Sequence, residues 1–309
     1  MTKRERIRAA LNGQPVDRTP YSLWYHFRLD PPVGEAMAQA ELDFYHRYDP
    51  DLLKVMHDIP YEMPEGLALV ESPADWSRLQ VLEGNRGSFG QQLATLKSIL
   101  AGRGDDGPVV DTVFGTFATA EKVCGKRTLE LLRQDPEATH RGLRTITESL
   151  CNYARALVAS GIDGIYLAIS GAASDTMSED EYRSTFLAYD QQVLAAATGA
   201  WLNVAHQHGV GIYPNLVLDL QGYQVYSWSG QLEGNPGVSA IRPKTDLCLL
   251  GGVNEATFGK VSPSEVLRQA KEAIAAGGDT FILGPGCAVP TPPDSSDENL
   301  KSFQAAVAA

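Results

Sequence analysis

The fold is decided by a stretch in the middle of the chain, Ser160-Gly161-Ile162-Asp163-Gly164-Ile165-Tyr166-Leu167-Ala168-Ile169. Before it lies an amphipathic pattern over residues 136–160, which predicts a helix that the glycine brings to an end. The apolar run at 164–169 is typical of a buried strand. A second helical pattern at 178–198 and a second apolar run at 201–205 follow. Strands separated by helices indicate a parallel sheet.

The same alternation extends over the whole chain. Eight apolar runs alternate with helical patterns, at residues 21–27, 52–56, 109–114, 164–169, 201–205, 224–228, 247–253 and 280–283. This number of strands predicts an α/β fold of the (β/α)8 TIM barrel type, with residues 1–309 forming one domain. The glycine-rich nucleotide-binding signatures are missing from the sequence, which disfavours an open dinucleotide-binding sheet.

Composition and charge narrow the possible functions. The chain has 309 residues, a formal net charge of -12, 43% hydrophobic residues and 21% charged residues, as expected of a globular protein. The negative charge disfavours binding to nucleic acid or to a membrane surface, so a small-molecule substrate is expected. The four cysteines are widely spaced and no apolar run could span a bilayer, so we expect reduced thiols and a cytoplasmic protein. The oligomeric state stays open.

Three residues at predicted strand ends form a candidate metal site. In a barrel of this type catalytic groups gather at the carboxyl ends of the strands. His206 and His208 follow the run at 201–205 and, being two residues apart, point the same way, while Cys287 follows the run at 280–283. Two imidazoles and a thiolate with one open position are typical of catalytic zinc. The alternative is a pair of hydrogen-bonded histidines beside an inert thiol.

Other strand ends carry candidate catalytic and binding groups. His57 and Asp58 end the second run and His26 lies near the end of the first, so we assign these three residues to catalysis. An apolar cleft with one cation suits an organic anion. The candidate substrate-binding residues are Trp24, Arg28, Tyr61, Phe114, Ser170 and Trp228. For the aromatic residues among them, a position in the core is the alternative.

Both ends of the sequence resemble the uroporphyrinogen decarboxylase superfamily, which includes cobalamin- and coenzyme-M-type methyltransferases. The opening residues 4–13, followed by Asp17-Arg18-Thr19-Pro20, look like the first helix and strand of that family. The closing Ile282-Leu283-Gly284-Pro285-Gly286-Cys287, with its proline-rich continuation, is similar to the last strand and final turn. The resemblance extends from end to end and implies the same (β/α)8 barrel.

The decarboxylase branch matches only in part. Its members carry an arginine-rich glycine motif after the first strand and a histidine in the last strand. Here the first segment has the single Arg28, and Pro285 stands where the histidine belongs. Asp58 does resemble the aspartate that gathers pyrrole N–H groups in that branch. Uroporphyrinogen itself is therefore disfavoured as the substrate, while a decarboxylase or lyase acting without a cofactor on another carboxylated molecule stays open.

The methyltransferase branch matches better at the metal site. Its members bind zinc through H-x-C-G and a final P-G-C. Pro285-Gly286-Cys287 matches the second motif, whereas His206-Gln207-His208-Gly209 has histidine in place of the first motif's cysteine. The resemblance implies a zinc-dependent methyltransferase that activates a thiol or similar small acceptor, with a corrinoid on a partner protein as a candidate methyl donor. A barrel with a binding function alone is the remaining alternative.

Overall fold

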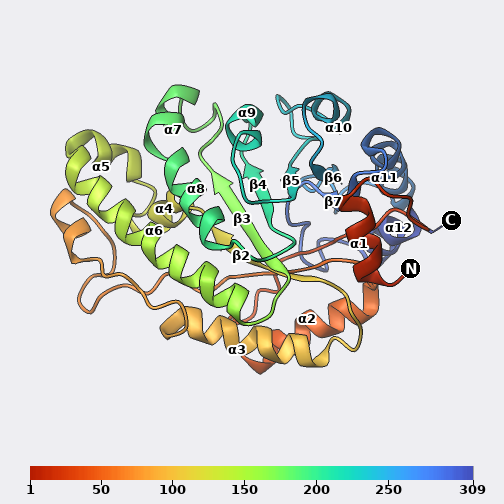
Figure 1. Cartoon of the computed structure of the whole chain (residues 1–309), viewed down its shortest axis with the longest axis horizontal. Coiled ribbons are helices and arrows are strands. Elements are labelled where there is room, and N and C mark those ends of the chain that lie inside the picture. The colour runs from red at the N-terminus through yellow and green to blue at the C-terminus, as the bar shows by residue number, and fades with distance from the viewer. Residues whose placement is uncertain (309) are drawn as a thin grey trace.

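A computed structural model describes residues 1–308 and contains a parallel sheet curled into a half-barrel (Figure 1). Seven strands lie side by side in their chain order and every neighbouring pair is parallel. They are β1 (Leu53–Val55), β2 (Val109–Phe114), β3 (Gly164–Ser170), β4 (Val204–His208), β5 (Val225–Trp228), β6 (Cys248–Val253) and β7 (Phe281–Pro285). The α/β class is therefore confirmed, and the sheet is consistent with a TIM-like barrel.

The expected first strand, at residues 21–27, is reduced to a single bridge. Tyr21 pairs with Leu283, whose carbonyl accepts the backbone N–H of Ser22 at 2.9 Å. Farther along, the carbonyl of Trp24 accepts the N–H of Val289, which lies in the loop after β7. The segment thus runs beside a loop instead of a strand, and no eighth strand is seen among residues 1–308. Its apolar pattern was a sign of burial, because Leu23 and Trp24 are both buried without ladder pairing.

Strand β4 runs farther than its apolar pattern suggests. The run at 201–205 predicts a strand that ends before the histidines, whereas β4 includes both His206 and His208. Residues two apart on a strand project from the same side of the sheet. Pairing with β3 continues to this end, with Ala168 opposite His206 and Ser170 opposite His208. Both imidazoles are therefore held by a regular ladder.

Helices cover the outer face of the sheet (Figure 1). They are α1 (Lys3–Leu11), α2 (Glu35–Tyr48), α3 (Gly87–Gly102), α4 (Thr116–Val123), α5 (Thr128–Gln134), α6 (Pro136–Ala159), α7 (Glu179–Thr185), α8 (Leu187–Ala196), α9 (Pro214–Leu218), α10 (Val238–Ile241), α11 (Pro263–Gly277) and α12 (Asp297–Ala305), with 3-10 turns η1 (Pro73–Arg78) and η2 (Arg242–Lys244). None of the helices in residues 1–308 combines the length and apolarity needed to cross a bilayer.

The helix starts follow ordinary capping chemistry. Asp135 precedes α6 and its carboxylate accepts the N–H of Ala138 at 2.9 Å, and Ser262 caps α11 in the same way. The helical pattern at 178–198 forms two helices, α7 and α8, which meet at Phe186. Phe186 is buried, so packing at that point takes precedence over a continuous helix.

Two apolar clusters flank the sheet. The larger lies between the strands and the helices, and the smaller fills the inside of the sheet. The inner cluster includes Trp24, Val110, Tyr166, Val204 and Ile282. It closes the interior below the carboxyl ends of the strands, where the cavity described next begins.

Candidate functional site

A cavity of about 540 Å³ opens at the carboxyl ends of the strands. Its wall comes from the segment after Tyr21, from β1 to β4 and from the loop after β7. The residues that carry polar or aromatic groups into it include Trp24, His26, Lys54, Thr112, Phe114, Tyr166, Ser170, His206, His208 and Cys287. Its volume is that of a site for a small organic molecule.

The predicted metal ligands meet in this cavity. One donor atom each of His206, His208 and Cys287 lies within 4.8 Å of the other two, and Cys287 Sγ is 3.9 Å from His208 Nδ1. The glycine before the cysteine makes this approach possible. A Cβ on Gly286 would lie 2.4 Å from Glu255 Oε2 and 2.6 Å from the Cα of Ser229. Any larger residue would push the loop that carries Cys287 away from β5.

His206 is prepared to act as a ligand. Its ring is 2% exposed and stacks on Tyr166, with the ring centroids 5.3 Å apart. Nδ1 lies 3.2 Å from the hydroxyl of Ser227, while Nε2 is buried and has no hydrogen-bond partner within residues 1–308. Burial lowers the pKa of His206, so the neutral ring with a free lone pair is favoured. An orphaned, neutral imidazole nitrogen is what a metal site requires.

The thiol of Cys287 is shifted towards the thiolate. Burial alone would raise its pKa, but the neighbouring His206 imidazole and the charge of Lys54 outweigh burial, and the net pKa is lowered. Two neutral nitrogens and one thiolate sulfur form a donor set that suits a borderline metal ion such as zinc. The residues present therefore fit the metal that the sequence suggested.

Lys54 is a cavity residue that the sequence analysis did not single out. It lies in β1 and is 4% exposed, and its Nζ is 4.8 Å from the ring centroid of Tyr166 and 5.4 Å from that of Trp24. Its Nζ donates a hydrogen bond to the thioether of Met56 at 2.8 Å, the one such bond of Lys54 within residues 1–308. Burial lowers the pKa of Lys54 to about 8. The sequence signal was available, because a single lysine interrupts the apolar run at 52–56.

His26 and Asp58 form a pair at the edge of the cavity. His26 lines it, and His26 Nδ1 lies 2.8 and 2.9 Å from the two carboxylate oxygens of Asp58. Asp58 does not itself line the cavity and stands behind the imidazole. Burial alone would raise the pKa of Asp58, but the hydrogen bond to His26 and the charges of His26 and Lys54 have the larger effect. The net pKa is lowered, and the carboxylate is favoured. The ionised Asp58 thus orients the imidazole of His26 at the edge of the cavity.

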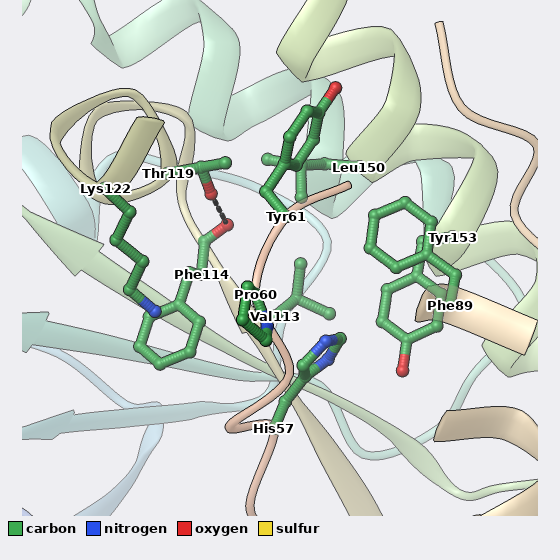
Figure 2. Close-up of a pocket in the computed structure, with 10 residues that line it drawn as sticks. All are labelled: His57, Pro60, Tyr61, Phe89, Val113, Phe114, Thr119, Lys122, Leu150 and Tyr153. Atoms are coloured by element: carbon green, nitrogen blue, oxygen red, sulfur yellow. Dashed lines mark hydrogen bonds between the residues drawn. The ribbon is translucent and has the colours of Figure 1, made fainter. Parts of the chain in front are cut away.

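His57 lies apart from this cavity, although it neighbours Asp58 in the sequence. It borders a separate space of about 30 Å³, large enough for water only, together with Tyr61 and Phe89 (Figure 2). Its Nδ1 is 3.7 Å from Asp111 Oδ2. Successive residues of an extended chain face opposite sides, which explains the separation of His57 from the metal ligands. The structure thus places His57 and Tyr61 at a different space from the cavity that His206 lines.

The other predicted substrate-binding residues divide into two groups. Trp24, Phe114 and Ser170 line the large cavity, and Phe114 also borders the small one. Arg28 is exposed and pairs with Asp294 at 3.2 Å. Trp228 is buried against Tyr226, because this side of β5 faces the outer core. Its indole N–H donates a hydrogen bond to the carbonyl of Pro236. Arg28 and Trp228 therefore lie outside the cavity.

Comparison with known families places the chain. The family model for uroporphyrinogen decarboxylase (URO-D) matches residues 33–309. The chain belongs to the uroporphyrinogen decarboxylase family. A uroporphyrinogen decarboxylase of Corynebacterium diphtheriae is 26% identical over 187 residues, 55% of this chain and 50% of that protein. This match thus spans about half the length of that relative.

Solved structures of other proteins show the same fold. A methyltransferase from Methanosarcina mazei superposes with a TM-score of 0.81 and 22% identity, covering 99% of this chain and 98% of that one. An endo-1,4-beta-mannanase from Rhizomucor miehei superposes with a TM-score of 0.55 and 8% identity, covering 94% of each chain. Barrels with different chemistry share this fold, so the reaction has to be argued from the site.

Proposed function

We propose that this URO-D family protein is a methyltransferase that holds zinc through His206, His208 and Cys287 and transfers a methyl group to a thiol or similar small acceptor. The observation that carries the proposal is the convergence of the three donor atoms within 4.8 Å at the wall of a cavity of about 540 Å³. When bound, zinc lowers the pKa of an acceptor thiol and favours its thiolate. A corrinoid on a separate protein is the methyl donor that we propose.

The protein groups around the site support a ligand at this place. His206 Nε2 has no other partner within the described residues, and Ser227 holds the opposite nitrogen of the ring. The wall also includes the aromatic side chains of Trp24, Phe114 and Tyr166, which can pack against an organic acceptor. His26, oriented by Asp58, is the titratable group that we assign to moving a proton at the cavity edge.

Metal content tests the proposal directly. Wild-type protein purified without a chelator should contain close to one zinc per chain, whereas Cys287→Ser and His206→Ala should lose most of it, because each removes one of three ligands. Cys151→Ser is the matched control: Cys151 is a buried thiol on α6 and lies outside the cavity. Elemental analysis of the four proteins measures the outcome.

Turnover with free methylcobalamin and a small thiol is the second assay. We expect demethylation, followed by the cobalamin absorbance, in the zinc-loaded wild type and its loss in Cys287→Ser. A wild-type protein that is free of metal and still turns over substrate would reject zinc. Full zinc content in Cys287→Ser would show that the three residues are not the ligands.

The pair of His26 and Asp58 supports a second candidate, a decarboxylase or lyase that acts without a cofactor. In that reaction Asp58 orients His26, and the His26 imidazole is the group that delivers a proton to the carbon that loses its carboxylate. Release of CO2 from a carboxylated substrate by the Cys287→Ser protein, with loss of this activity in His26→Gln, would favour the second candidate over methyl transfer.

A further inference from the structure

Ser227 is a buried polar residue on an otherwise apolar side of β5. Residues alternate along this strand, so Val225 and Ser227 project towards the inside of the sheet, whereas Tyr226 and Trp228 pack in the outer core. Ser227 is 0% exposed. A buried hydroxyl costs free energy unless it is hydrogen-bonded, so the partners of Ser227 indicate its role.

The hydroxyl of Ser227 has two hydrogen-bond partners within residues 1–308, and both lie at the candidate metal site. Its Oγ is 3.2 Å from His206 Nδ1 and 3.3 Å from the hydroxyl of Tyr166, where either oxygen can be the donor. His206 and Ser227 lie directly opposite each other in the ladder of β4 and β5. The backbone pairing therefore sets the distance between this hydroxyl and the imidazole.

Tyr166 supports both members of this contact. Its ring stacks on the His206 imidazole, with an interplanar angle of 29°, and its hydroxyl reaches Ser227 Oγ. A serine side chain by itself can rotate among the staggered rotamers. The second hydrogen bond, to Tyr166, favours the rotamer of Ser227 whose hydroxyl faces His206.

The tautomer of His206 determines whether its ring can bind a metal. A neutral imidazole carries one proton, and the nitrogen without the proton offers the lone pair. Ser227 is bonded to Nδ1, so the buried Nε2, which has no hydrogen-bond partner within residues 1–308, is the atom left for a metal. The proton must then stay on Nδ1, and Ser227 Oγ is the acceptor within its reach. Such a hydrogen bond from the second ring nitrogen usually orients a histidine ligand.

We propose that Ser227, held by Tyr166, is a positioning residue of the metal site. It accepts the Nδ1–H of His206, keeps the ring in the tautomer with a free Nε2 and fixes the direction of the ring. This inference rests on the proposed function, because zinc is the ion that Nε2 would bind. Within the described chain Ser227 stands behind the imidazole and is not among the residues that line the cavity, so it acts through His206.

The second histidine has no such support in the part of the chain that the structure describes. Ser170 lies opposite His208 in the ladder of β3 and β4, as Ser227 lies opposite His206, but no hydrogen bond joins the two side chains within residues 1–308. His208 is exposed, and its Nδ1 is 3.9 Å from Cys287 Sγ. Of the two imidazoles, His206 is therefore the one whose direction is set before a metal binds.

Zinc affinity, measured by competition with a chelating dye, tests the role of Ser227. Ser227→Ala should lose about tenfold to a hundredfold in zinc affinity, because the ligand loses its hydrogen-bond partner. Tyr166→Phe keeps the stacked ring and should lose less, and Ser227→Thr, which restores the hydroxyl, should regain most of the affinity. Ser22→Ala is the matched control and should bind zinc as the wild type does, since Ser22 is equally buried but donates to the carbonyl of Leu52.

NMR of zinc-loaded protein with 15N-labelled histidine provides a readout that a general loss of stability would not move. In the wild type the Nδ1–H proton of His206 should resonate at the low field typical of a hydrogen-bonded N–H. In Ser227→Ala it should move to higher field and exchange faster with water, because it has lost its acceptor. Ser22→Ala should leave the signal in place. Its absence from His206→Gln assigns the signal.

The outcomes separate this inference from the proposed function. A wild type that takes up no zinc would reject both. A Ser227→Ala protein that binds zinc as tightly as the wild type, or that keeps the His206 N–H signal unchanged, would overturn the role of Ser227 and leave the zinc site in place. An equal loss of zinc affinity in Ser22→Ala would also overturn it, because any buried hydroxyl would then have the same effect.

Discussion

Replacing Lys54 with methionine should make the protein more stable at neutral pH. The fall of the Lys54 pKa from 10.5 to about 8 corresponds to about 3.4 kcal/mol, since one pKa unit is worth about 1.4 kcal/mol. Methionine has a similar length and no charge to desolvate. It loses the contacts of the ammonium group with Trp24 and Tyr166, worth about 1 to 2 kcal/mol. The expected gain in unfolding free energy is therefore about 1 to 3 kcal/mol.

The gain should depend on pH in a defined direction. Between about pH 8 and 10.5 the unfolded chain still holds the Lys54 proton that the folded chain has released, so the stability of the wild type rises with pH in this window. The advantage of the variant should be largest below pH 8 and should shrink as pH approaches 10.5. The charged groups that act on Lys54 are Cys287, Glu41, Asp58 and Asp111, and all of them remain in the variant.

Urea unfolding of metal-free wild type and Lys54→Met, at about pH 7 and about pH 10, measures this effect. Lys97→Met, at an exposed position on α3, should change stability by less than about 0.5 kcal/mol at either pH. A variant less stable than the wild type at pH 7, or a difference that does not change between the two pH values, would refute the reasoning that burial of Lys54 is costly.

Three further predictions concern other parts of the chain. Gly286→Ala should lower zinc content and reduce the unfolding free energy by about 1 to 3 kcal/mol, because the new Cβ would lie 2.4 Å from Glu255 Oε2. Gly237→Ala, whose Cβ would have 4.0 Å of clearance, should keep its zinc, and equal zinc content in the two variants would contradict this. Asp135→Ala should lower the unfolding free energy by about 1 kcal/mol through loss of the α6 cap, and Asp135→Asn should restore most of that stability. Urea unfolding measures both variants, and an unchanged midpoint in Asp135→Ala would rule out the cap. Burial raises the pKa of Asp190 from 3.8 to about 7, so the wild type loses stability as pH rises from about 4 to 7. Asp190→Asn should remove this dependence, and parallel curves of unfolding free energy against pH for the two proteins would contradict the prediction.

Most of the fold could be predicted from the sequence, since apolar runs and helical patterns reflect burial directly. The run at 109–114 coincides with β2. The failure at 21–27 has a physical cause: a buried extended segment has the same apolar pattern whether its backbone pairs with a strand or, as at Trp24, with a loop. A break such as that at Phe186, between α7 and α8, depends on tertiary packing that the helical period does not contain.

The candidate site was predictable where it depends on strand ends. His206, His208 and Cys287 could be brought together because carboxyl ends of parallel strands meet at one face of a barrel. The position of Lys54 in the large cavity could not be predicted in this way, because Lys54 lies in the middle of β1 and not at the end of that strand. His57 does follow the end of β1, but its side chain borders the small space and not the large cavity, because a position at a strand end does not determine which way a side chain points.

The segment that begins at Tyr21 is joined to β7 by a single bridge, between Tyr21 and Leu283. Adjacent strands such as β2 and β3 are held over five paired positions, whereas this seam has one. Trp24 and His26, which lie just beyond the seam, form part of the cavity wall. The loop after β7 holds this part of the wall in place of a strand ladder, because the N–H of Val289 donates to the Trp24 carbonyl and the hydroxyl of Thr291 donates to the His26 carbonyl. One loop therefore positions both this side of the entrance and Cys287.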